Sequence, residues 1–212
     1  LIIFANGLVT ELESARQILQ PGDVLCAADG GTRHALELGL IPSVVIGDLD
    51  SLSSDDRFWL ASQSVEFQQF SRDKDETDLE LALHYGLQAG YREILIVGGL
   101  GGRIDQTLGN LSLLTNPELD TLEIRMDDGV EEVFFTHSQC RICGRRGDRV
   151  SLIPWGGEVS GITTQGLRWP LRSETLFPDR TRGISNEMLD DQATIHLKSG
   201  LLLVIHHRQK RR

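Results

Sequence analysis

The sequence predicts an α/β fold, in which a mostly parallel, doubly wound N-terminal domain precedes a small C-terminal antiparallel β-sandwich. Short apolar runs alternate with helical patterns from the beginning to about Phe135. After about Gly144 short β-rich runs follow one another, separated by Gly, Pro and Asn, with no convincing helix between them. The 212 residues are enough for one large domain, or for a medium and a small one. We therefore expect domains at residues 1–140 and 141–212, with the boundary near "CGRRGD".

The first part of the chain contains six apolar runs that are typical of buried strands. They lie at residues 1–5, 23–29, 43–48, 64–70, 92–99 and 121–126. Strands that alternate with helices are joined by right-handed crossovers, which place them parallel in one sheet. Such a sheet is covered by helices on both faces, which explains why its strands are apolar throughout.

Helical spacing of apolar residues predicts five helices between these strands. The helical patterns lie at residues 12–19, 35–39, 58–61, 79–87 and 104–114. In the fourth, Thr77 and Glu80 have the spacing of a capping box, so the helix is expected to begin directly after Thr77.

The second part of the chain predicts strands only. The β-rich runs lie at residues 148–155, 157–167, 192–200 and 201–207. They are short enough for a small antiparallel sheet or a sandwich. The basic end, "HHRQKRR" at residues 206–212, matches no motif and is interpreted as a solvated terminal charge cluster.

Composition limits the classes of function. Hydrophobic residues make up 40% and charged residues 25% of the chain, as in ordinary soluble proteins. We expect no membrane span, because no apolar run reaches 18 residues. The formal charge of -10 argues against a nucleic-acid partner, which requires a basic surface. Three cysteines fit a reducing cytoplasm better than a disulfide framework, and they lack the partners of a zinc site.

Carboxylates follow four consecutive strands of the predicted sheet. They are Asp29, then Asp48 and Asp50, then Asp73, Asp75 and Asp78, and finally Asp105. The carboxyl ends of parallel strands meet at one edge, where ligands bind. For Asp48 and Asp50 alone a polar turn is the better interpretation. All four groups together favour a cation among them, because carboxylates at one edge repel one another. Oxygen ligands without His or Cys suit Mg²⁺.

The stretch "GGLGGRIDQ", residues 98–106, allows two interpretations. Four glycines let the backbone approach a ligand closely, and a following helix could present its N-terminus to phosphate. The stretch lacks the complete P-loop and dinucleotide-binding patterns, which argues against a Walker ATPase and a Rossmann dehydrogenase. A tight turn would explain the glycines, but not Arg103 and Asp105 beside them.

The ordered motifs resemble those of thiamine pyrophosphokinases. They are "ADGG", "GDLDS", "KDETDLELAL", "GGLGGRIDQTLGN", "GLRWPL" and "GISNE", and together they span nearly the whole chain. The resemblance implies an α/β nucleotide-binding domain, a C-terminal β-sandwich and a homodimer with active sites at the interface. It also implies Mg²⁺-dependent transfer of the pyrophosphoryl group of ATP to the hydroxyl of thiamine, which gives thiamine diphosphate and AMP.

The resemblance also implies roles for individual residues. It implies Asp48, Asp50 and Asp78 as ligands of Mg²⁺. It implies the same three residues, together with Asp105, as catalytic residues. For ATP and its phosphates it implies Asp29, Gly30, Gly31, Lys74, Asp75, Gly101, Gly102 and Arg103. For thiamine it implies Gln106, Trp169, Ser185 and Asn186. Either Asp78 or Asp105 could take the hydroxyl proton. A Trp face attracts a cation such as the thiazolium of thiamine, although Trp169 could instead be a core residue and Ser185 and Asn186 turn residues.

Two other functions fit the same residues. One is a different Mg²⁺-dependent phosphotransferase or nucleotidyltransferase that acts on another small alcohol. The other is a non-catalytic ligand-sensing module, whose acidic edge binds a metal and whose β-domain contacts a partner.

Overall fold

The structure, a computed structural model, describes residues 1–9 and 11–209 and divides the chain into two compact units. The N-terminal unit is Leu1–Gly129 and the C-terminal unit begins at Val130. The predicted boundary at residue 140 therefore lies inside the second unit. The reason is strand β7 (Glu131–Thr136), which pairs with β13 (Ser199–His207) near the end of the chain.

The described residues of the N-terminal unit form six strands, each parallel to its neighbours within the unit. They are β1 (Ile2–Phe4), β2 (Leu25–Ala28), β3 (Val44–Gly47), β4 (Glu66–Gln69), β5 (Glu93–Val97) and β6 (Glu123–Asp127). Their order in the sheet is β4-β3-β2-β1-β5-β6. All six predicted runs form strands, and the parallel arrangement inferred from strand–helix alternation is confirmed.

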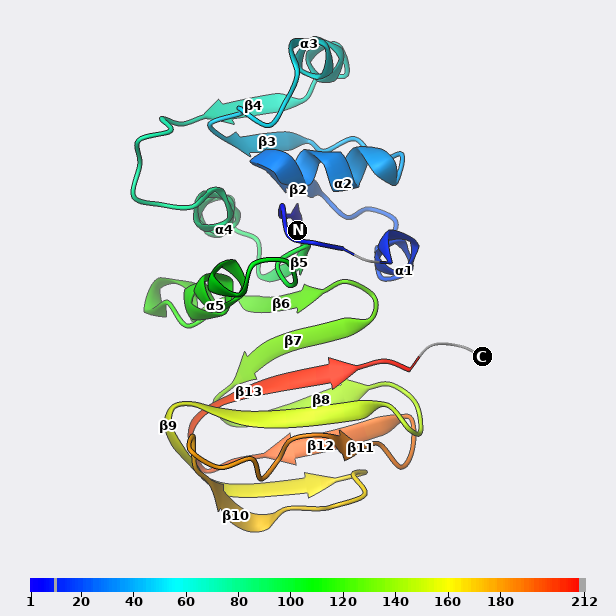
Figure 1. Ribbon diagram of the computed structural model, residues 1–212, viewed down its shortest axis with the longest axis vertical. Coiled ribbons are helices and arrows are strands. Elements are labelled where there is room, and N and C mark those ends of the chain that lie inside the picture. Colours follow the sequence, from blue (N-terminus) through cyan, green and yellow to red (C-terminus); the bar gives the residue numbers. More distant parts are fainter. Residues whose placement is uncertain (10, 210–212) are drawn as a thin grey trace. The chain divides into compact units, whose positions relative to one another are not determined.

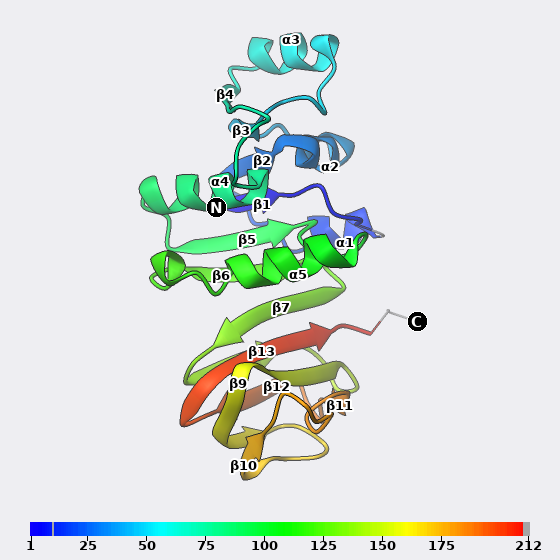
Figure 2. The ribbon, with the colours of Figure 1, turned by 60° about the vertical axis from the view of Figure 1, so that its left-hand side comes forward.

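The helices of this unit cover the sheet (Figure 1, Figure 2). They are α1 (Leu12–Arg16), α2 (Thr32–Glu37), α3 (Ser54–Ser62), α4 (Asp78–Gln88) and α5 (Ile104–Leu113), with 3₁₀ turns η1 (Asp29–Gly31) and η2 (Pro117–Leu119). Ala15, Ala35 and Leu60 from the first three helices join one buried cluster with alternate strand residues such as Phe4 and Val45. Helix α4 packs against β2 and β3.

Two helix beginnings position residues at the carboxyl edge of the sheet. The Thr77 hydroxyl accepts a hydrogen bond from the Glu80 amide at 3.2 Å, so Thr77 caps α4 and Asp78 is its first residue. Helix α5 begins at Ile104, directly after the glycine-rich turn. Both helices therefore begin where strands β4 and β5 have ended.

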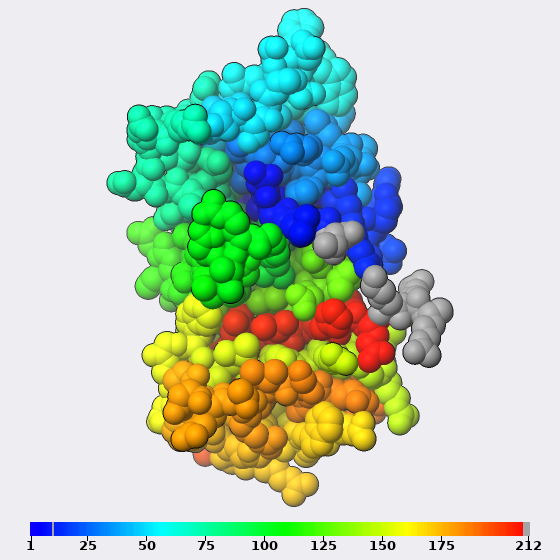
Figure 3. Space-filling view, viewed as in Figure 1, coloured from blue at the N-terminus to red at the C-terminus, as the bar shows by residue number. Residues whose placement is uncertain are grey.

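The C-terminal unit is antiparallel throughout its described residues. Besides β7 and β13 its strands are β8 (Gln139–Cys143), β9 (Arg149–Gln165), β10 (Arg172–Leu176), β11 (Asn186–Glu187) and β12 (Gln192–His196). These strands pair in the order β7-β13-β9-β12-β8. Strands β10 and β11 lie outside this order, and both pair with β9. Its core includes Ile142, Leu152, Ile162, Leu176 and Leu202. The segment that contains β11, orange in Figure 3, covers part of the surface of this unit.

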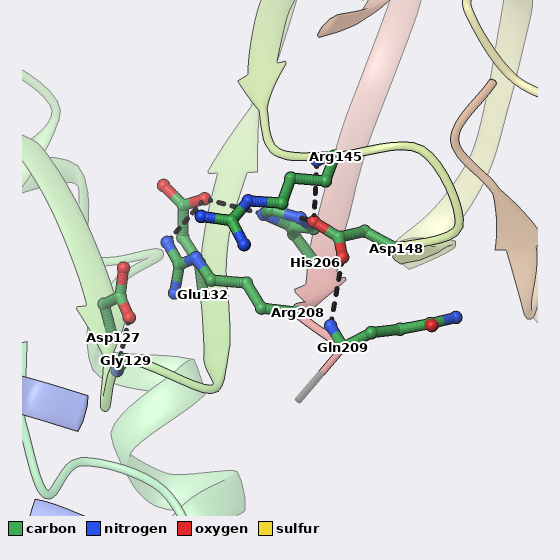
Figure 4. Close-up of polar contacts among 8 residues, drawn as sticks. All are labelled: Asp127, Gly129, Glu132, Arg145, Asp148, His206, Arg208 and Gln209. Carbon is green, nitrogen blue, oxygen red and sulfur yellow. Dashed lines mark hydrogen bonds and ion pairs between the residues drawn. The ribbon is translucent and has the colours of Figure 1, made fainter. Parts of the chain in front are cut away.

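The interpretation of residues 206–212 as a solvated end is wrong for its first residue. His206 lies in β13 and is fully buried, directly opposite Glu132 of β7 (Figure 4). Strand pairing therefore continues through the first two basic residues. Residues 210–212 lie outside the described part of the chain.

Strands β7, β8, β10 and β11 were not predicted. Their runs are only two to six residues long, and those of β10 and β11 are mostly polar. Among the helices of the described residues, none has the length and hydrophobicity needed to cross a membrane.

Candidate active site

The carboxyl edge of the N-terminal sheet opens into a cavity of about 710 Å³. This size lies within the range of about 300–1,000 Å³ for small-molecule sites. Sequence-predicted residues from the segments that follow β2 and β4 line it, namely Asp29, Gly30, Lys74 and Asp78. Others come from the turn after β5 and the beginning of α5, namely Gly101, Gly102, Arg103 and Gln106.

Three carboxylates gather beside this cavity. One oxygen from each of Asp29, Asp48 and Asp50 lies within 4.8 Å of the others, in an arrangement that could hold a metal ion. The Oδ1 atom of Asp29 is buried and has no hydrogen-bond partner among the described residues. A buried polar atom without a partner is costly unless a ligand satisfies it. The oxygen-only donor set therefore fits a hard cation such as Mg²⁺.

The backbone of the "GDLDS" turn separates Asp48 from Asp50. Between them Leu49 is buried in the apolar core and adopts a positive φ of 65°. The Asp50 amide donates to Oδ1 of Asp48 at 3.0 Å, which tightens the turn. Asp29 also has a positive φ, of 39°. Such conformations cost free energy outside glycine and cluster at functional sites.

Asp78 lies against the same acidic group. A Cβ added at Gly47 would lie 2.8 Å from Cβ of Asp29 and 3.0 Å from Cγ of Asp78, so only glycine leaves room there. The Lys74 ammonium donates to Oδ1 of Asp78 at 2.8 Å. Burial raises the pKa of Asp78 above its usual value, and the charges of Asp29 and Asp48 raise it further, against the opposing effect of Lys74. The acidic group therefore contains four carboxylates and one nearby ammonium from Lys74.

The glycine-rich turn packs against the chain that follows β1. Gly98 and Gly101 have positive φ, and side chains there would meet the carbonyl oxygens of Ala5 and Leu8. The following residues are exposed, and Arg103 Nε donates to Oδ1 of Asp105 at 3.1 Å. This hydrogen bond lowers the pKa of Asp105.

Five of the predicted nucleotide or catalytic residues do not line the cavity, namely Gly31, Asp48, Asp50, Asp75 and Asp105. A side chain at Gly31 would collide with the carbonyl of Phe4, so this glycine allows η1 to pack on β1. Asp75 is exposed.

Several polar lining residues were not predicted as site residues, among them Asn6, His34, Arg72 and Asn110. Asn110 follows Gln106 by four residues on α5, so helical spacing could have identified it. His34 bonds through Nε2 to the Gly7 carbonyl at 2.8 Å, a contact that no sequence pattern indicates.

The remaining predicted residues lie in the C-terminal unit. Trp169 is 49% exposed and is therefore not a core tryptophan. Asn186 is buried and its side chain is hydrogen-bonded to the backbone of Trp169. Ser185 has a positive φ of 58°, and its amide donates to the Ser151 hydroxyl at 3.0 Å.

Known proteins resemble this chain in sequence and structure. The family model for the catalytic domain of thiamin pyrophosphokinase matches residues 15–126, and the model for its vitamin B1 binding domain matches residues 139–202. The thiamine pyrophosphokinase of Bacillus subtilis is 31% identical over 179 residues, with 84% of each chain covered.

Solved structures agree with these matches. The crystal structure of thiamine pyrophosphokinase from Bacillus subtilis superimposes with a TM-score of 0.87 at 27% identity and covers 99% of each chain. That of thiamin pyrophosphokinase from Geobacillus thermodenitrificans has a TM-score of 0.83 at 25% identity, covering 99% of this chain and 97% of its own.

Proposed function

The chain belongs to the thiamin pyrophosphokinase family and is an enzyme of that kind, and we propose that the cavity of its N-terminal unit is where ATP and thiamine react. One observation carries the proposal. A cluster of carboxylates that includes an unpartnered buried oxygen adjoins a cavity lined by Lys74 and Arg103. Carboxylates that hold a divalent cation, together with cationic side chains, are what a bound triphosphate requires.

The acidic residues would hold Mg²⁺. We assign Asp48 and Asp50 as ligands, together with Asp29, which has a buried oxygen without a partner among the described residues, while Asp78 adjoins the group beside Lys74. When bound, the ion would neutralise the charge of the phosphates and polarise them toward attack. Lys74 and Arg103 would bind phosphate oxygens. Asp75, on the loop that leads to α4, would act at the outer edge of the phosphate site.

The chemical step is a displacement at the β-phosphorus of ATP. The thiamine hydroxyl oxygen forms a bond to this phosphorus, and the bond from it to the oxygen bridging the α-phosphorus breaks, so AMP leaves. The chain contributes positioning and charge, which dominate such reactions. Gly30, Gly101 and Gly102 let the backbone approach the phosphates.

The proton of the hydroxyl needs an acceptor. Asp78 lines the cavity, whereas Asp105 does not line it and is paired with Arg103. A general base must lie within hydrogen-bond reach of the proton that it accepts. We therefore assign the proton to Asp78 and give Asp105 the role of holding Arg103.

Gln106 and Trp169 would each contact thiamine, Trp169 by stacking on it, and Ser185 and Asn186 lie beside that tryptophan. We further propose that the enzyme is a cytoplasmic homodimer, that the active sites lie at the interface, and that the C-terminal strands form a thiamine-binding β-sandwich.

The reaction can be tested with ATP labelled at the β-phosphorus. With Mg²⁺ and thiamine present, the label should appear in thiamine diphosphate while unlabelled AMP is released. Formation of ADP would contradict pyrophosphoryl transfer and would favour a simple phosphotransferase. AMP release that does not depend on thiamine would instead contradict the proposed acceptor. No turnover at all would favour a sensing module.

The role of Trp169 can be tested by substitution with alanine. Loss of one desolvated cation–π contact costs about 1–2 kcal/mol, so the KM for thiamine should rise roughly 5- to 30-fold while the KM for ATP changes little. Trp59→Ala is the matched control, because Trp59 is 45% exposed, on α3 and outside the cavity lining. Equal increases in both KM values would mean that Trp169 has a structural role.

A further inference from the structure

One buried side chain binds the backbone of Trp169 on both sides. Oδ1 of Asn186 accepts hydrogen bonds from the Trp169 amide at 3.1 Å and from the Glu187 amide at 2.9 Å. Nδ2 of Asn186 donates to the Trp169 carbonyl at 2.8 Å. Only this orientation of the amide matches each donor with an acceptor. Asn186 therefore replaces, for Trp169, the two hydrogen bonds that a neighbouring strand would supply.

The place of this contact explains why a side chain is needed. The segments 166–168 and 187–189 form a short antiparallel ladder. In it the Leu189 amide donates to Gly166 and the Arg168 amide donates to Glu187, both at 2.9 Å. Pro170 cannot continue the ladder because it has no N–H group. The Asn186 amide takes over where the backbone ladder ends.

Glu187 helps to position the indole ring of Trp169. Its carboxylate Oε2 accepts from Arg168 at 3.2 Å, and the Arg168 guanidinium carbon lies 5.1 Å from the centre of the Trp169 ring. One face of the indole is therefore covered while about half of the residue stays exposed. Adjacent residues of β11 thus hold the backbone of Trp169 directly and its ring through Arg168.

The support for β11 is firm. Asn186 and Glu187 pair with Val150 and Arg149 of the long strand β9. Asn186 is only 5% exposed, so its amide has little access to water that could replace these bonds. The clamp is therefore preformed in the protein without a ligand.

We propose that Asn186 is a positioning residue for the thiamine subsite and acts through Trp169 rather than by touching thiamine. The proposal rests on the proposed function, in which Trp169 stacks on thiamine. A large side chain that is ordered before binding loses less freedom when the ligand arrives. Asn186 thereby converts an exposed loop tryptophan into a fixed stacking surface, which should strengthen thiamine binding specifically.

The test is a double-mutant cycle of Asn186→Ala and Trp169→Ala, with KM measured for both substrates. We expect Asn186→Ala to raise the KM for thiamine about tenfold and to leave the KM for ATP within twofold. In the Trp169→Ala background the same change should add less than twofold. Non-additivity of this kind shows that two residues act through one contact.

Each alternative gives a different pattern. A full tenfold increase in the Trp169→Ala background would mean that Asn186 touches thiamine itself, and the proposal would be overturned. Parallel loss of ATP binding and thermal stability would mean a general role in folding, and an unchanged thiamine KM would mean no positioning role. If the unmodified chain shows no thiamine-dependent AMP release, the proposed function fails before any variant is made.

Two further variants keep the test decisive. Asn186→Asp retains an acceptor for the Trp169 amide but places an oxygen against the Trp169 carbonyl, so it should resemble Asn186→Ala if the clamp matters. Asn116→Ala is the matched control, because Asn116 also accepts a backbone hydrogen bond, from Glu118 at 3.1 Å, outside the cavity lining. It should leave the thiamine KM unchanged.

Discussion

Each unit of the chain gathers carboxylates, but the two groups differ in how their charge is balanced. In the C-terminal unit Glu132 and Asp148 flank the buried ring of His206 (Figure 4). Nδ1 of His206 lies 3.3 Å from Oε2 of Glu132, and Nε2 lies 3.0 Å from Oδ2 of Asp148. The Arg208 guanidinium lies 3.6 Å from Glu132. The chain therefore supplies the side-chain partners of these carboxylates itself.

The acidic group of the N-terminal unit is balanced much less completely. Asp29 has an oxygen without a hydrogen-bond partner among the described residues. Arg72 reaches Asp50 at 3.6 Å, but this exposed ion pair is of a kind that contributes little. The comparison suggests a rule for this molecule. Carboxylates that stabilise the fold are paired within the chain, whereas those that we propose to serve the reaction have fewer partners among the described residues.

Asp48 offers the most direct test of the difference between the two acidic groups. Asp48→Asn should lower kcat about 10²–10³-fold, the usual cost of removing one electrostatic group from a reaction centre, and should leave folding intact. Activity measured against Mg²⁺ concentration checks it. Asp55→Asn, at an exposed position in the first turn of α3, is the control. Undiminished turnover would show that Asp48 has no role at the metal.

The second prediction concerns stability and the C-terminal unit. Oδ1 of Asp148 accepts a hydrogen bond from the Gln209 amide at 3.0 Å. Oδ2 accepts one from the Arg145 amide at 2.9 Å and also lies 3.0 Å from Nε2 of His206. Asp148→Asn should therefore lower the free energy of unfolding by roughly 2–3 kcal/mol, because hydrogen bonds to a buried charge are strong.

Urea denaturation in a Trp59→Phe background checks this prediction. Trp155 and Trp169 then report on the C-terminal unit alone. The exposed residue Asp179 supplies the control, as Asp179→Asn should change little. A destabilisation by Asp48→Asn that equals that of Asp148→Asn would remove the distinction between the two groups.

The two groups also differ in how far the sequence predicts them. Asp29, Asp48 and Asp50 follow strands, and the convergence of parallel strand ends at one edge predicts that they meet, as they do. The same rule does not indicate which oxygen lacks a partner. It also suggests Asp105, which the structure instead pairs with Arg103. Side-chain pairing of this kind depends on rotamers, which no sequence pattern fixes.

The group around His206 could not be predicted at all. Its members come from β7, the turn before β9 and β13, and His206 faces Glu132 only because of the register between two antiparallel strands. Register depends on tertiary pairing rather than local pattern. The run at residues 201–207 predicted β13, but the basic letters at 206–212 gave no sign that His206 is buried. Strand β7 lies within the residues that were assigned to the first domain, so the boundary between the units was placed too late.

The third prediction is that acid lowers the stability of the C-terminal unit. Burial raises the pKa of Asp148, but hydrogen bonds from Gln209, His206 and Arg145 lower it more, so its pKa lies below the usual value. Such a carboxyl contributes stability above its unfolded pKa, about 3.9, and this contribution is lost as pH falls through that value toward the folded pKa. Stability of the C-terminal unit should hold from pH 7 to about 5 and then fall by up to about 1.4 kcal/mol per pH unit.

Urea denaturation at a series of pH values checks this slope. Asp148→Asn removes the titrating group, so the difference between the unmodified chain and the variant should shrink as pH falls below about 4. A difference that stays constant across the whole range would show that Asp148 does not provide the acid dependence.

The smallest effect is expected at Asp29, and its sign is opposite to that at Asp148. Asp29→Asn removes one negative charge from the unbalanced group and keeps a residue type that tolerates positive φ. Without Mg²⁺ the variant should be more stable than the unmodified chain by about 1 kcal/mol, because charge repulsion is relieved.

The unmodified chain should gain stability when Mg²⁺ is added, by linkage, and the variant should gain much less. Thermal unfolding with and without Mg²⁺ measures both changes, with Ca²⁺ as a comparison ion. If Asp29→Asn destabilises the chain and leaves the Mg²⁺ increment intact, the buried oxygen of Asp29 belongs to the fold, and the two acidic groups are alike after all.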